Sequence, residues 1–95
     1  MVLYTPEDIE IKEIVNIVNA LPKVKSLHHV HIWQLNEEET HLEAHIDFNS
    51  NITIFEFGEI LYTIEGILQE KFKINHVTLQ PEYENMDDKD IIVQD

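Results

Sequence analysis

Hydrophobic residues near the start of the chain recur every three or four positions, which is the spacing of one helical face. They are Ile11, Ile14, Val15, Val18 and Leu21. Before them, Thr5 suits the N-cap and Pro6 the first helical position, and Pro22 after them cannot continue a helix. The pattern predicts a helix from about Asp8 to Leu21.

Two segments then change to the two-residue period of β-strands. The first, residues 24–35, carries Val30 and Ile32 on one face and His29, His31 and Trp33 on the other. The second, residues 41–48, alternates strictly between Leu, Ala, Ile or Phe and His, Glu or Asp. A polar stretch at residues 36–40 separates the two segments. Together they are predicted to form a hairpin.

From about Thr53 to Phe72 the hydrophobic spacing is again that of a helix. Gly66 in its middle indicates close packing, since Gly costs about 1 kcal/mol relative to Ala inside a helix. Residues 76–82 then read as a short strand, with Val77 and Leu79 on its apolar face. Pro81 places this strand at a sheet edge or near the strand's end.

The predicted fold class is α+β, an αββαβ two-layer sandwich with both helices on the apolar face of a three-stranded sheet. A right-handed crossover would make the strands at 41–48 and 76–82 parallel. The domain is expected to span residues 1–82, and the acidic tail at 83–95 is expected to be flexible. No further element is left to cover the polar face of the sheet.

Charge narrows the range of partners. Nineteen acidic residues stand against six Lys and no Arg, a net charge of −13. This balance disfavours nucleic acid and anionic membrane surfaces, and it favours metal cations or basic partners. No apolar run approaches the roughly 18–20 residues of a spanning helix, so no membrane insertion is expected.

Composition also limits the chemistry. The absence of Cys excludes disulfides, thiolate ligands and a thiol nucleophile. Two Gly cannot supply a phosphate-binding loop, and no Ser–His pair has a third group that suggests a triad. We therefore expect no enzymatic activity.

The polar strand faces are rich in metal-ligand types. His45, His76, Gln80 and Glu82 share the polar parity of two strands, and His28, His29 and His31 lie in or just before another. Imidazole and carboxylate without sulfur suit Zn²⁺ and related divalent ions. Exposed strands also carry His and Glu without any function, so spacing alone leaves both a metal site and a solvated face open.

Three ordered blocks of sequence resemble a known family. Residues 27–33 (LHHVHIW), 42–45 (LEAH) and 76–82 (HVTLQPE) are similar to motifs in the C-terminal cytosolic domain of cation diffusion facilitator (cation efflux) transporters. The resemblance runs from about residue 4 to residue 82. It implies a ferredoxin-like or metallochaperone-like αββαβ fold, a cytosolic location, a homodimer, and a membrane-embedded transporter domain in the parent chain.

The resemblance also implies a metal site for Zn²⁺ or another divalent transition metal. The family's metal positions correspond here to His28, His45, His76 and Glu82, with His29, His31 and Gln80 as possible additional ligands. His29 stands where the family usually has Asp. Metal binding is expected to tighten the dimer and so regulate transport.

Two other functions remain open from the sequence. One is a free-standing soluble metal buffer or chaperone without a membrane partner, and the other is a purely structural dimerisation module. The start Met-Val-Leu at the domain edge favours a domain excised from a transporter over a free-standing relative.

Overall fold

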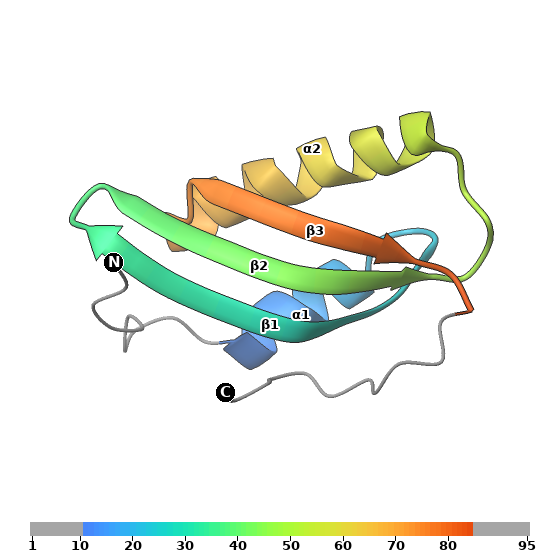
Figure 1. Ribbon diagram of the computed structural model, residues 1–95, viewed down its shortest axis with the longest axis horizontal. Helices are drawn as coiled ribbons and strands as arrows, with labels where there is room; N and C mark the ends of the chain where they lie inside the picture. Colours follow the sequence, from blue (N-terminus) through green and yellow to red (C-terminus); the bar gives the residue numbers. More distant parts are fainter. Residues whose placement is uncertain (1–10, 85–95) are drawn as a thin grey trace.

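The computed structural model describes residues 11–84 and arranges them as helix, strand, strand, helix, strand (Figure 1). The elements are α1 (Ile11–Asn19), β1 (Val24–Asn36), β2 (Glu39–Phe48), α2 (Ile54–Phe72) and β3 (His76–Glu82). This confirms the predicted αββαβ order. The first helix ends two residues earlier than predicted, while its predicted start and the acidic tail beyond residue 84 lie outside the described residues.

The sheet has the order β1-β2-β3, with β1 antiparallel to β2 and β2 parallel to β3. The predicted hairpin and parallel crossover are both confirmed. Figure 1 shows α1 and α2 on one side of the sheet, and no helix of residues 11–84 lies on the other face. Since β3 pairs only with β2 within residues 11–84, Pro81 is tolerated in this edge strand.

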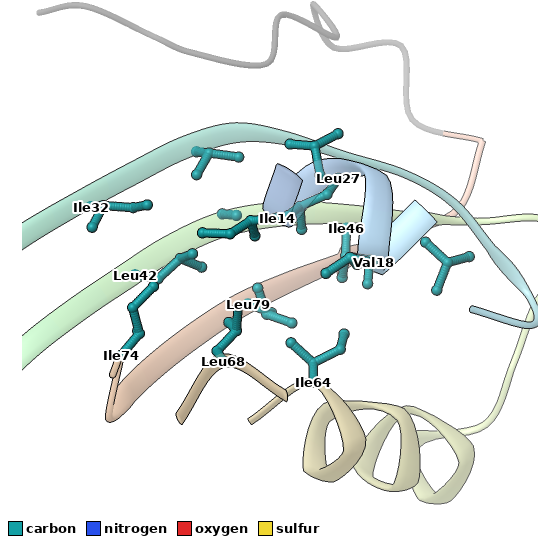
Figure 2. Packing of buried hydrophobic residues seen from close by; sticks show 14 of the residues in the cluster. Ile14, Val18, Leu27, Ile32, Leu42, Ile46, Ile64, Leu68, Ile74 and Leu79 are labelled. Atoms are coloured by element: carbon teal, nitrogen blue, oxygen red, sulfur yellow. The ribbon is translucent and has the colours of Figure 1, made fainter. Parts of the chain in front are cut away.

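The core lies between the sheet and the two helices (Figure 2). Ile14 and Val18 from α1 and Ile64 and Leu68 from α2 are each at most 1% exposed. They pack in one cluster with inward side chains of the strands, such as the fully buried Ile46. Burial of each such side chain contributes about 1.5–3 kcal/mol, so the helices hold the sheet's apolar face firmly.

The ends of α2 are defined by side-chain and backbone hydrogen bonds. The Thr53 hydroxyl accepts from the Glu56 amide at 3.0 Å, and the Glu56 carboxylate accepts from the Thr53 amide at 2.9 Å. Lys23 forms an ion pair with Glu56, and this contact lowers the pKa of the Glu56 carboxyl. At the other end Lys73 adopts φ 60°, and the Ile74 amide donates to the Leu68 carbonyl at 3.1 Å.

The prediction of close packing at Gly66 is wrong. Gly66 is exposed on α2, and a methyl group added there would meet no atom within 4 Å. The helix is therefore held by its caps and its buried stripe, and Gly66 contributes no close approach within the described chain.

A β-bulge in β1 decides which residues reach the polar face. His28 pairs with His45 and His31 with Glu43, so His29 and Val30 together oppose one residue of β2. His29 has φ 54°, a left-handed conformation in which His is more common than most residues. The extra residue lets Leu27 and Val30 both enter the core, and it brings His28 and His29 to the same face.

We predict that Thr53→Ala lowers the free energy of unfolding by about 1 kcal/mol, because it removes the hydroxyl that caps α2. Thr63→Ala is the matched control, since the exposed Thr63 hydroxyl only donates to the Glu59 carbonyl one turn earlier. That change should be neutral or slightly stabilising. Urea unfolding of both variants measures the difference, and equal losses would contradict the capping role.

Candidate metal centre

The strand register arranges the polar face as four rows that each cross all three strands. Each row takes one residue from β1, one from β2 and one from β3. In order along β2 the rows are Ser26–Asp47–Glu82, His28–His45–Gln80, His31–Glu43–Thr78 and Trp33–His41–His76. Apart from His31, which lies in the row of Glu43, the candidate ligands therefore occupy the two ends of one sheet face.

Three of the four predicted ligands meet at one end of this face. The Glu82 carboxylate lies between two imidazoles, with Oε2 2.6 Å from His45 Nδ1 and Oε1 3.3 Å from His28 Nε2. One ligand atom from each residue lies within 4.8 Å of the other two. We call His28, His45 and Glu82 the Glu82 cluster.

The Glu82 cluster is shielded from solvent. The side chains of Glu82 and His28 are 2% and 1% exposed, whereas that of His45 is 27% exposed. Asp47, beside Glu82 in the register, is also buried. The expectation of an uncovered polar face is thus wrong at this end. Because an isolated buried carboxylate is very costly, its charge must be balanced by hydrogen bonds or by a cation.

Hydrogen bonds supply part of this balance. His45 Nδ1 lies 2.6 Å from Glu82 Oε2, and in the tautomer that carries its proton on Nδ1 the ring donates a short, charge-assisted hydrogen bond to the carboxylate. The side-chain amide of Gln80 donates from Nε2 to Glu82 Oε2 at 3.3 Å. A divalent ion bound between these groups would take the place of a proton, since metal ligands must be deprotonated. As predicted from Pro81, β3 is an edge strand that ends one residue later, and Glu82 is its last residue.

The possible additional ligands surround the Glu82 cluster. The ring of His29 stacks on that of His45, with centroids 4.7 Å apart and planes inclined by 23°. His29, His31, His45 and Gln80 line the same open groove on the polar face. His29 is thus brought to the cluster by the bulge, whereas His31 lies one row away, opposite Glu43.

The fourth predicted ligand, His76, lies in a different group. Its ring stacks on that of His41 with centroids 4.3 Å apart, and its Nε2 is 3.5 Å from Glu39 Oε2. Glu39 and His41 were not among the predicted ligands. The signal that could have found His41 is its parity with His45 on the strictly alternating strand, together with the parallel register.

Within residues 11–84, no helix combines the length and the apolar character that crossing a membrane requires.

Comparison with known proteins identifies the family. The family described as "Cation efflux protein, cytoplasmic domain" matches residues 6–84. The chain is 34% identical over 80 residues to the cadmium, cobalt and zinc/H⁺-K⁺ antiporter of Bacillus subtilis, covering 84% of this chain and 25% of the antiporter. It is 32% identical over 81 residues to zinc homeostasis factor 1 of Schizosaccharomyces pombe, covering 84% of this chain and 21% of that protein. The chain thus spans about a quarter of the length of these curated relatives.

Solved structures agree with this assignment. The metal-bound C-terminal domain of the CzcD transporter from Cupriavidus metallidurans is 32% identical, with a TM-score of 0.67, and the match covers 78% of this chain and 99% of that one. The corresponding CzcD domain from Thermotoga maritima has the same fold, with a TM-score of 0.66 at 19% identity over 81% of this chain and 92% of that one. The αββαβ chain belongs to the cation efflux family, and its residues 6–84 correspond to the cytoplasmic domain of that family.

Proposed function

We propose that this domain regulates a divalent-cation efflux transporter by binding Zn²⁺ or a similar ion at the Glu82 cluster and by forming a homodimer on the cytosolic side of the membrane. The observation that carries the proposal is the buried Glu82 carboxylate, which contacts one imidazole from β1 and one from β2. The relatives' names support the ion class, since they include cadmium, cobalt and zinc.

The donor set of the cluster fits a borderline divalent ion. Two imidazole nitrogens and one carboxylate oxygen suit zinc and other late first-row metals better than Mg²⁺ or Ca²⁺, which prefer oxygen. Zinc bonds of 2.0–2.1 Å in a tetrahedron place ligand atoms about 3.3 Å apart. The 3.3 Å between His28 Nε2 and Glu82 Oε1 already has this value. The 2.6 Å contact of His45 must open slightly when its proton is replaced by metal.

Net charge explains how an ion would act on a dimer. Two copies of a chain with a charge of −13 repel each other, and bound cations reduce that repulsion. A ligand that binds the dimer more tightly than other states shifts the population toward the dimer. A small domain also buries a low fraction of its surface, so a second copy adds needed burial. Metal concentration in the cytosol would thus set the state of the domain.

The proposal predicts that Glu82→Gln weakens Zn²⁺ binding by at least tenfold, because the substitution removes the anionic ligand shared by both imidazoles. Glu43→Gln is the matched control, since Glu43 is exposed on the same face of the sheet between the two ends. Isothermal titration of the 95-residue chain measures both affinities. Equal affinities for the two variants would refute the Glu82 cluster as the site.

Metal-dependent stability should depend on pH. Protons compete with metal for imidazole, which titrates near pH 6.5 in model peptides. The rise in melting temperature caused by a modest, subsaturating Zn²⁺ concentration should therefore be large at pH 7.5 and mostly lost by about pH 5. A chelator provides the baseline at each pH. The same rise at both values would argue against histidine ligands.

The domain is expected to be a homodimer at micromolar concentration without metal, and Zn²⁺ should strengthen the association. Sedimentation equilibrium with chelator and with Zn²⁺ tests both statements. A monomer under both conditions would contradict the regulatory mechanism, even if the metal itself binds.

A further inference from the structure

We propose that the opposite end of the polar face holds a second, separate site for a divalent transition-metal ion, formed by Glu39, His41 and His76. One ligand atom from each of these residues lies within 4.8 Å of the other two. The group shares no residue with the Glu82 cluster. His41 and His45 are four residues apart on β2, which at about 3.3 Å per residue separates the two groups by about 13 Å.

The geometry of the group is close to that of a bound ion. The 3.5 Å between His76 Nε2 and Glu39 Oε2 is too long for a good hydrogen bond, but it is near the roughly 3.3 Å between two ligands of tetrahedral zinc. His41 Nε2 is shielded from solvent and has no hydrogen-bond partner among residues 11–84. Part of the bonding capacity of this ring is therefore unused in the described chain.

The carboxylate of Glu39 is oriented by the hairpin. Asn36 donates from its amide nitrogen to Glu39 Oε1 at 2.8 Å, and the Asn36 amide oxygen accepts from the Glu38 amide at 2.8 Å. The second bond fixes the direction of the Asn36 amide group. Glu39 Oε2 is the oxygen that approaches His76. This arrangement is typical of metal sites, where a hydrogen bond to one carboxylate oxygen positions the ligand.

Asn75 fixes His76 relative to the same hairpin. The Asn75 side chain accepts from the Thr40 amide at 3.1 Å and donates to the Glu38 carbonyl at 2.5 Å. The Asn75 amide also donates to the Thr40 carbonyl at 3.1 Å. These bonds join the start of β3 to the start of β2, so the backbone that carries all three proposed ligands is held in place.

The surroundings select the class of ligand. Two imidazoles and one carboxylate favour Zn²⁺, Ni²⁺, Co²⁺ or Cu²⁺ over Mg²⁺ or Ca²⁺. Glu37 and Glu38 at the exposed hairpin tip add negative charge nearby, which raises the local concentration of cations. The side chains of Glu39 and His76 are 43% and 49% exposed, so this site exchanges with solvent more easily than the Glu82 cluster.

The chain carries its own reporter for this site. Trp33 is the single Trp, and its ring stacks on that of His41 with centroids 5.2 Å apart and planes inclined by 15°. An ion bound to His41 changes the electronic environment of this ring. An ion bound at the Glu82 cluster lies at least two rows of side chains from Trp33, so it should affect the fluorescence of Trp33 much less.

The experiment titrates Zn²⁺ into the 95-residue chain and records both heat and Trp33 fluorescence. We expect two ions per chain and a fluorescence change that follows one of them. His41→Phe keeps an aromatic ring beside Trp33 but removes the ligand, and Glu39→Gln tests the carboxylate. Each should weaken the fluorescence-linked event at least tenfold. Glu43→Gln, on the same face, should change neither event.

Glu82→Gln separates this proposal from the proposed function. It should weaken the other binding event and leave the fluorescence-linked event within about twofold of the unsubstituted chain. The second site is refuted if Zn²⁺ leaves Trp33 fluorescence unchanged. It is equally refuted if the fluorescence response survives both His41→Phe and Glu39→Gln, or if it is lost in Glu82→Gln alone.

Discussion

The backbone pairing of β2 with a strand on each side is the constraint on which the rest of the structure depends. Side chains in a strand alternate between faces, so a slip of one residue would exchange every core residue with a polar one. The helices prevent such a slip, because they bury Leu42 and Ile46 on the apolar face. The same register places His41 beside His76 and Asp47 beside Glu82. Core packing on one face therefore sets the ligand geometry on the other.

The two groups of ligands differ in how strongly their charges interact. The Glu82 carboxylate is almost completely shielded, so its interactions with a cation are little screened by water or salt. The Glu39 carboxylate is close to half exposed and is screened more. One sheet face thus combines an enclosed group of candidate ligands and a more accessible one. In a chain with nineteen acidic residues and six Lys, metal cations are well suited to balance both groups.

Periodicity predicted much of the fold, and its failures have physical reasons. The alternation in residues 41–48 and the helical spacing in 53–72 identified β2 and α2, because each is long and has one buried face. Gly66 was misread because its cost inside a helix was taken as a sign of close packing, although it lies two residues from both Ile64 and Leu68 and therefore off the apolar stripe. The burial of His28 was not predicted either, since it depends on a bulge that strict alternation cannot represent.

The sequence predicted which types of residue form the candidate site, but not which of them lie together. Parity and resemblance selected His28, His45 and Glu82, which the structure brings together. They also selected His76, which the structure groups with Glu39 and His41 instead. All these residues share one face, and only the strand register shows which of them lie in neighbouring rows. Because register depends on long-range pairing, residue spacing along the chain could not show that the candidate ligands fall into two groups.

The left-handed conformation of His29 has a consequence for how this position can vary. Among residues with a side chain, Asn, Asp and His tolerate such a backbone best, while β-branched residues are strongly disfavoured. The family resemblance places Asp at this position, and Asp satisfies the same backbone requirement. Asp and His are also common metal ligands. The backbone conformation at position 29 therefore limits which residues can replace His29. Asp, which this conformation allows, can also coordinate metal beside His45.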